Sequence, residues 1–342
     1  MHRADKAVLR LALGLGLAAL VAYGGGVRAP FVTCVMAVVV LCRPGPPIPI
    51  LKGAVLAAVF AALTATGMLM VPLLENYSLA GIALTGTLLY AVFLSGARTT
   101  SKLPTILVIA LTVIPVAGVA EQALASAVIR SLAVGLFIGI FVSSAFHALF
   151  PDAPAPAPKA AAPAVPGPEA ARWMAMQATV VIMPVFVLAL TNPAFYLAAI
   201  MKTAALGQQA SSLNARSAGQ ELVGSTLMAA CMAALVWLGL SLLPNLWMLM
   251  LWLMAAALWA GARLFRIKAT SFSPSFWVNA MMTMLILLGP AIEDSANGKD
   301  VFKASVIRVT LFVGIALYAW ATVWALDRWR ELRSFALVLK RH

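Results

Sequence analysis

The sequence predicts an all-α polytopic membrane protein with about 12 transmembrane helices, arranged as two parallel six-helix repeats. Of its 342 residues, 63% are hydrophobic and only 10% are charged, and the mean hydropathy is +0.98. Soluble domains carry about 25% charged residues. Apolar runs of about 17 residues or more recur along the chain, each long enough to cross ~30 Å of hydrocarbon as a helix. The short alternating segments of a membrane β-barrel are absent from the sequence.

Six spans are predicted in the first half, residues 1–150. The N-terminal run at 8–25 follows basic residues, but no Ala-x-Ala cleavage site ends it, so we expect a retained helix. A short run from Pro30 to Cys42 ends at the Pro/Gly-rich breaker of residues 43–49. The other four runs cover residues 52–74, 79–97, 103–120 and 124–150.

A change in composition separates the two halves. Residues 151–171 form an Ala/Pro-rich stretch that is typical of an extended linker without a core. The second membrane repeat, residues 172–327, is then predicted to repeat the plan, and a basic tail follows at 328–342. Its six apolar runs cover residues 173–191, 193–206, 218–243, 245–264, 273–291 and 301–326.

The basic residues indicate how the chain is oriented. If both termini are cytoplasmic, most lysines and arginines fall in cytoplasmic loops, and acids such as Glu121 and Asp300 fall outside. Six spans per half is an even number, so the two repeats share one orientation. They would be related by a pseudo-two-fold axis along the membrane normal.

A duplicated arginine is the main candidate for a functional residue. Val-Ile-Arg ends at Arg130 in the sixth run and at Arg308 in the twelfth, each about two helical turns into the run. An arginine at such depth costs roughly 2.5–3.5 kcal/mol on insertion scales, so a matched pair suggests an anion path between the repeats. In the alternative, each arginine snorkels to the surface or pairs with Glu121 or Asp300 to hold the fold.

The second apolar run of each half gives a further indication. Both runs are unusually short, and they begin at Pro30 and Pro193. Short or Pro-interrupted segments at matching places in two halves indicate a substrate site. A short helix sunk within the bundle is the plainer alternative.

Three other residues are candidates for binding or coupling. Lys202 lies inside the short run of the second half and either adds to the anion path or snorkels to the interface. Glu221, at the head of the ninth run, is a candidate proton coupler or an acid that complements the helix dipole. His147, near the end of the sixth run, is a second coupling candidate, with a structural role as the alternative.

Other classes of function lack the residues they need. The +13 net charge is placed in short loops and is not interleaved with aromatics, so nucleic-acid binding is not expected. Cys34, Cys42 and Cys231 have no metal-ligand spacing, and no catalytic or nucleotide-binding motif is present. We therefore expect no metal, no cofactor and no enzymatic activity.

The layout of two six-span halves, each closed by a helix carrying Arg130 or Arg308, resembles the fusaric acid resistance and aromatic acid exporter superfamily. Plant aluminium-activated malate transporters belong to the same broad group. The resemblance implies anion transport, with the pore's basic residue carried onto Arg130 and Arg308. It also implies a multi-pass protein of the bacterial inner membrane that works with a periplasmic adaptor of the membrane-fusion type. The large cytosolic domains of the long exporters have no counterpart in this sequence.

Together these features favour an efflux transporter for small organic anions, aromatic carboxylates among them, driven by the proton gradient. A passive anion channel on the same scaffold is the first alternative, and a non-transporting membrane scaffold is the second. The expected partners are the anion, the lipid bilayer and the adaptor, and a homodimer is one option for assembly.

Overall fold

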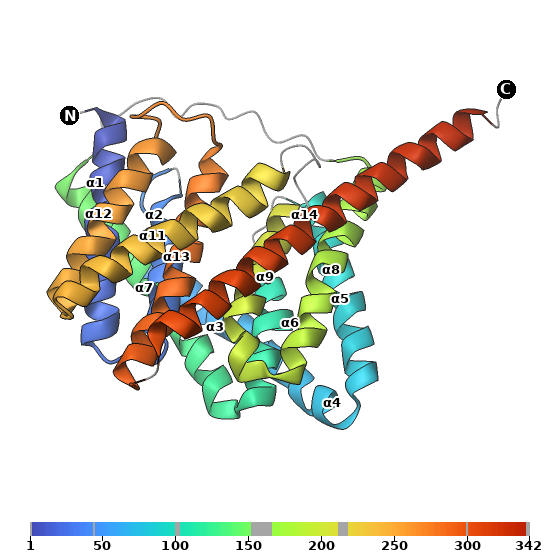
Figure 1. The fold of residues 1–342 in the computed structure, drawn as a ribbon, viewed down its shortest axis with the longest axis horizontal. Coiled ribbons are helices and arrows are strands. Elements are labelled where there is room, and N and C mark those ends of the chain that lie inside the picture. The colour runs from blue at the N-terminus through green and yellow to red at the C-terminus, as the bar shows by residue number, and fades with distance from the viewer. Residues whose placement is uncertain are drawn as a thin grey trace. The chain divides into compact units, whose positions relative to one another are not determined.

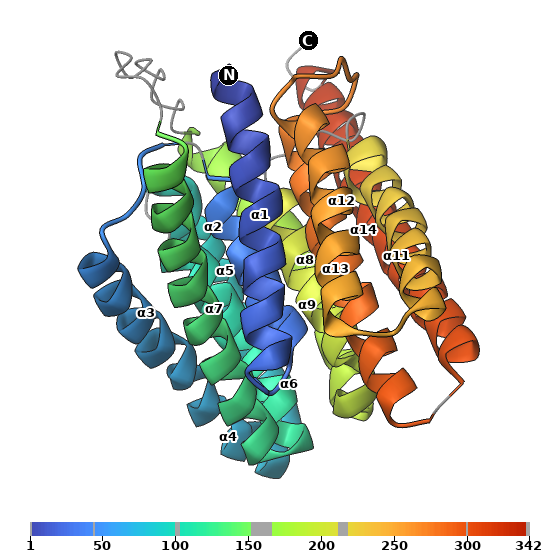
Figure 2. The same cartoon turned by 90° about the vertical axis from the view of Figure 1, so that its left-hand side faces the viewer.

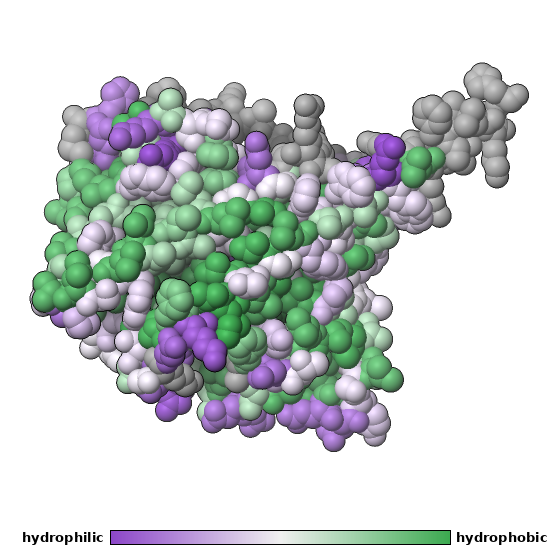
Figure 3. All heavy atoms as spheres, viewed as in Figure 1, coloured by the Kyte–Doolittle hydropathy of each residue, from purple (hydrophilic) through white to green (hydrophobic). Residues whose placement is uncertain are grey.

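The computed structural model describes residues 2–43, 45–99, 103–151, 166–210, 218–298 and 300–339. Within these residues the regular structure is helical throughout, and a helix lies over each of the predicted spans (Figure 1). Ten helices are long and apolar enough to cross a membrane. Apolar side chains cover much of the surface in Figure 3, and hydrophilic ones gather near helix ends. The chain is therefore a polytopic helical membrane protein.

The two predicted short runs form the helices that fall outside this set of ten. The helix α2 (Pro30–Leu41) has only 12 residues, and α9 (Pro193–Ala210) lacks a sufficiently apolar stretch of 18 residues because it includes Lys202 and two glutamines. Pro30 and Pro193 are the first residues of these helices. Proline is well suited to a first helical position because its missing N–H would have no partner there.

The helices form two compact units, and each unit takes helices from both halves of the sequence. Unit 1 contains α1 (Arg3–Gly24), α2, α3 (Ile50–Ala65), α7 (Gln122–Leu149), α11 (Ser225–Leu242), α12 (Leu246–Leu264), α13 (Pro274–Ala296) and the first turns of α14 (Val301–Leu339). Unit 2 contains η1 (Thr66–Met70), α4 (Val71–Asn76), α5 (Ser78–Arg98), α6 (Leu103–Ala120), α8 (Pro168–Thr191), α9, η2 (Gly219–Gly224) and the rest of α14.

In unit 1, α2 is surrounded by its neighbours, and residues 31–38 are all buried. It packs closely on α7, where a Cβ added at Gly135 would come within 2.7 Å of the Cα of Thr33. Gly139, one turn further on, faces Ala37 in the same way. Small residues at this spacing let two helix backbones approach closely, which is how helices associate when lipid removes the hydrophobic driving force between them.

In unit 2, α9 takes the corresponding place and packs on α8 and α6. Ala199, Ile200, Lys202 and Thr203 on α9 are all buried. Gly207 allows the close approach to α8, because an added Cβ would lie 2.5 Å from the Cδ1 atom of Ile182.

The helix pairings in the two units correspond to each other if α1, α2, α3, α5, α6 and α7 are matched in order with α8, α9, η2–α11, α12, α13 and α14. In unit 1, α1 packs on α12 and α2, while α2 packs on α13. In unit 2 the matching helices pack in the same way, with α8 on α5 and α9, and α9 on α6. Figures 1 and 2 label these helices along the chain. A duplicated chain produces this pattern if each unit combines helices from both copies.

The third span of each half contains an irregular turn where the chain passes from one unit to the other. In the first half, the 3₁₀ helix η1 follows α3, and in the second half the π-helix η2 precedes α11. Neither hydrogen-bond pattern is that of a regular α-helix, and such segments are frequent at hinges and functional sites.

Several boundaries differ from the sequence predictions. The last helix continues past residue 326 to Leu339, so most of the predicted basic tail is helical. The helix α13 runs to Ala296 and places the acids of residues 293 and 294 within its last turns. Residues 152–165 of the predicted linker and 340–342 of the tail lie outside the described residues.

Candidate functional site

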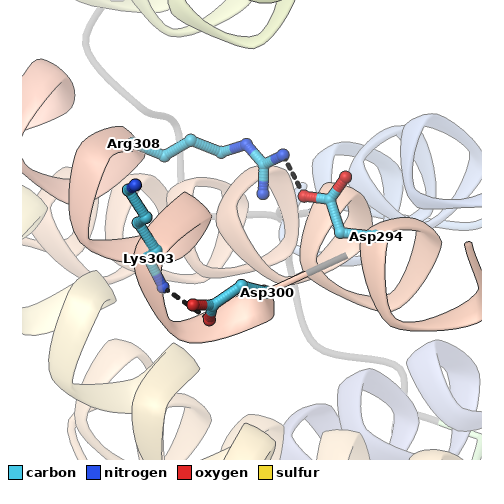
Figure 4. A network of polar contacts seen from close by, with 4 residues as sticks. All are labelled: Asp294, Asp300, Lys303 and Arg308. Atoms are coloured by element: carbon cyan, nitrogen blue, oxygen red, sulfur yellow. Dashed lines mark hydrogen bonds and ion pairs between the residues drawn. The ribbon is translucent and has the colours of Figure 1, made fainter. Parts of the chain in front are cut away.

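The Arg308 guanidinium lies on the second turn of α14 and forms an ion pair with Asp294 at the end of α13 (Figure 4). Both residues belong to unit 1. The side chains retain only 18% and 10% of their exposure, respectively. Burying a guanidinium or a carboxylate alone costs desolvation free energy, and the ion pair offsets much of that cost.

Only part of the Arg308 guanidinium is used by Asp294. The ion pair is made through Nη2, whereas Nη1 is buried and has no hydrogen-bond partner among the described residues. Buried N–H donors usually have a partner in protein or ordered water. Arg308 therefore presents an unused donor beside a fixed ion pair.

The partner of Arg308 differs from the acids that the sequence analysis considered. Asp300 is instead the N-cap of α14, where its Oδ1 accepts a hydrogen bond of 3.1 Å from the backbone N–H of Lys303. Figure 4 shows the two contacts separately. Asp294 was missed because the predicted span ended at residue 291, which placed this acid in an outer loop. Its signal in the sequence was its nearness, 14 residues away, to a deeply placed arginine.

Arg130, the matching arginine of the first half, lies on α7 and is exposed in its unit. Its Nε donates to the carbonyl of Ser126 on the same helix, at 3.4 Å. Within the described residues it makes no ion pair and no contact with Arg308. The two arginines thus occupy matching places on α7 and α14 but have different surroundings, and the structure shows no joint site formed by them.

Lys202 is fully buried near the middle of α9, in unit 2. It does not snorkel to the surface of its unit, and it has interaction partners within the chain. A buried ammonium loses its hydration and is stabilised only by such partners. Lys202 is therefore the most deeply placed basic residue of the candidate set.

Glu221 lies in the π-helix η2 of the same unit and is 9% exposed. It also has interaction partners within the chain. It stands in the first turn of its helix, so complementing the helix dipole accounts for part of its placement. Its location in a π-helical turn, which is frequent at functional sites, keeps it as a coupling candidate.

His147 lies in the last turn of α7, and its Nδ1 is 2.8 Å from the carbonyl oxygen of Ser143 on the same helix. A contact of this kind within one helix matches the structural alternative from the sequence analysis. No further contact of the ring connects it with Arg130 or Arg308 in the described part of the chain.

The fold and these contacts define a multi-pass helical membrane protein with charged and polar residues buried in both of its units. A family model described as a protein of unknown function (DUF2955) matches residues 7–146. The match covers α1 to α7 almost completely and ends close to the predicted end of the first repeat, residue 150. No curated protein and no solved structure matches the chain.

Proposed function

We propose that this protein is an efflux transporter for small organic anions, with carboxylates as the substrate class. The observation that carries the proposal is Arg308, whose guanidinium is held by Asp294 and keeps the buried Nη1 donor without a partner. A permanent positive charge with an unused donor suits a carboxylate, which accepts charge-assisted hydrogen bonds. The ion pair fixes the guanidinium, so an arriving anion would not have to order it.

The proposal extends to the topology and the membrane. Twelve crossings in two parallel repeats, with both termini in the cytoplasm of a bacterial inner membrane, fit the charge distribution of the loops. The matching helix pairings of the two units support a duplicated chain. A relation to the fusaric acid resistance superfamily and a periplasmic adaptor remain proposals from the resemblance, as does a homodimer.

Proton coupling is proposed through Glu221, and Lys202 is a second buried basic or acidic side chain in the same unit that is a candidate for anion binding. A proton-driven transporter needs a titratable group that is shielded from bulk water. Glu221 meets this requirement because it is 9% exposed and lies in an irregular helical turn. His147 is the weaker candidate because its ring is engaged with its own helix.

The test is uptake of radiolabelled benzoate into proteoliposomes under an imposed pH gradient. We expect Arg308→Gln to raise KM about 10- to 100-fold, because a hydrogen bond to a charged group contributes about 1.5–3 kcal/mol. Arg308→Lys should retain part of the activity, since an ammonium carries the charge but cannot reproduce the fork of the guanidinium. Lys303→Gln, an exposed position on the same helix, is the matched control and should transport normally.

The same assay separates transport from passive flux. An exporter should concentrate benzoate against its gradient when a pH gradient is imposed, and Glu221→Gln should abolish that accumulation. A channel would equilibrate benzoate and never accumulate it. Unchanged uptake by Arg308→Gln would remove the central residue from the proposal.

A further inference from the structure

The seam between α8 and α14 in unit 2 contains two buried hydrogen-bond donors without acceptors. Gln177 on α8 is 3% exposed, and its Nε2 has no partner among the described residues. Trp173 lies one turn earlier on the same helix, and its buried Nε1 also has no hydrogen-bond partner among the described residues. Residues four apart lie on one face of a helix, so the two donors are neighbours.

Contacts on either side place these donors along α14. The ring of Trp173 stacks on Trp329 with centroids 5.9 Å apart. Further along the seam, the Tyr318 hydroxyl donates to the carbonyl of Val180 at 2.8 Å. Gln177 lies between Trp173 and Val180 in the sequence of α8, so it lies between the ring stacking with Trp329 and the hydrogen bond from Tyr318. The guanidinium of Arg330 is 5.8 Å from the Trp173 ring and adds positive charge at this end of the seam.

The matching seam in unit 1 shows what such donors normally do. There α1 packs beside the end of α7, and two residues of α1 that are also four apart reach backbone carbonyls. Lys6 Nζ donates to Pro151 at 2.6 Å, and Arg10 Nη1 donates to Phe150 at 3.2 Å. These carbonyls are available because α7 ends at Leu149. Cations that bond the last carbonyls of a helix are a common way of capping it.

Among the described residues of unit 2, α14 offers no free carbonyls at this place. The helix α14 continues past Trp329 to Leu339, so its carbonyls at the level of Trp173 and Gln177 are used within the helix. The cations of α1 are replaced on α8 by a neutral indole and a neutral amide. The N–H groups of Trp173 and Gln177 therefore have no acceptor at the place where Lys6 and Arg10 of unit 1 donate to backbone carbonyls.

We propose that the α8–α14 seam binds a carboxylate group, with Trp173 Nε1 and Gln177 Nε2 as its donors. Two adjacent donors match the two oxygens of a carboxylate, and Arg330 at the mouth of the seam favours an anion over a neutral carbonyl. The proposal rests on the proposed function, because the transported anion is the expected source of the carboxylate. An anionic lipid headgroup carries similar oxygens and is separated by the experiment.

The experiment measures equilibrium binding of radiolabelled benzoate to the full-length protein in nanodiscs of neutral phosphatidylcholine. The variants are Trp173→Phe, which keeps a ring and removes the N–H, and Gln177→Leu. Each should weaken benzoate binding about fivefold to tenfold, because one hydrogen bond is lost. Gln177→Glu should weaken it more by repelling the anion. Trp247→Phe, at a 64%-exposed position, is the matched control and should bind as the parent protein does.

Thermal unfolding of the same variants without ligand shows whether the donors serve the fold. A buried donor without a partner contributes no stability, so Gln177→Leu should melt at the parent's temperature or above it. A lowered melting temperature of Gln177→Leu would mean that its amide has a partner within the protein and would overturn the proposal. Unchanged benzoate binding in Trp173→Phe and Gln177→Leu would overturn it as well.

Two further comparisons separate the sources of the carboxylate and the two proposals. If a lipid headgroup occupies the seam, replacing neutral lipid with phosphatidylglycerol should displace benzoate from the parent protein but not from Trp173→Phe or Gln177→Leu. This result would overturn the assignment of the transported anion to the seam. In an Arg308→Gln background, which removes the proposed transport site, Trp173→Phe and Gln177→Leu should still weaken the benzoate binding that remains. Normal transport by Arg308→Gln with weakened binding in Gln177→Leu would refute the proposed role of Arg308 and leave the seam site standing.

Discussion

At the scale of single residues, the charged side chains differ in whether they have a partner within the protein. Arg308 and Asp294 stabilise each other, whereas within the described residues Arg130 bonds to its own helix and Nη1 of Arg308 has no partner. A protein selected for stability alone would gain little from a buried ion pair, since apolar residues of equal volume often serve as well. The retained pair with an unused donor is the observation on which the proposed anion binding rests.

Removing the acid of this pair should destabilise the protein strongly. Asp294→Ala removes the direct ion-pair partner of Arg308 and leaves only its weaker charge interaction with Glu293, and we expect a loss of about 3 kcal/mol, at the low end for buried pairs. Asp300→Ala removes only an N-cap bond and should cost about 1 kcal/mol.

Denaturant unfolding in detergent micelles gives both values. A double-mutant cycle with Arg308→Gln then isolates the coupling, and the double variant should be more stable than Asp294→Ala alone. Equal losses in Asp294→Ala and Asp300→Ala would contradict the buried ion pair.

At the scale of elements, sequence periodicity predicted where helices lie but not how they pair. Apolar runs locate each span because length and hydropathy suffice to recognise a crossing helix. Pro30 begins a short helix of 12 residues, as predicted, whereas the helix that begins at Pro193 has 18 residues and is as long as α6. By contrast, Asp294 was missed because a hydropathy boundary ends a span at the first acid, although the helix continues. The donors of Trp173 and Gln177 are recognisable only when the neighbouring helix is in place.

The 3₁₀ segment η1 should be intolerant of even a small side chain. A Cβ at Gly67 would lie 2.0 Å from the carbonyl oxygen of Ala110 on α6, and a backbone atom cannot move aside. We expect Gly67→Ala to reduce stability by about 2 kcal/mol or more, as overpacking in tight cores does. Gly314→Ala on α14 meets no atom within 4 Å and should be neutral or stabilising, because alanine favours helix.

Melting temperatures of the two glycine variants in the same detergent test this contrast. Similar melting temperatures for both would show that η1 does not pack against α6 as described.

At the scale of the whole molecule, the compact units and the halves of the sequence are different divisions of the chain. Each unit combines a first, second and sixth helix of one half with a fourth and fifth helix of the other. Hydropathy cannot reveal this exchange, since it reports segments and not partners. Because each unit combines helices of both halves in the same way, both units show the same set of helix pairings.

Each half lacks part of what its helices bury against, because α1 and α2 also pack on α12 and α13, and α8 and α9 also pack on α5 and α6. Expressed alone, residues 1–150 contain α1 and α2 but lack α12 and α13, the helices on which they pack in unit 1. In membranes, helices without their partners remain exposed to proteases and to non-native association. We therefore expect each half alone to be degraded, and the two halves expressed together to form a stable complex. Co-purification of a tagged first half with an untagged second half, followed by size-exclusion chromatography, measures this. A first half that is monodisperse and protease-resistant by itself would show that the sequence halves, and not the exchanged units, fold independently.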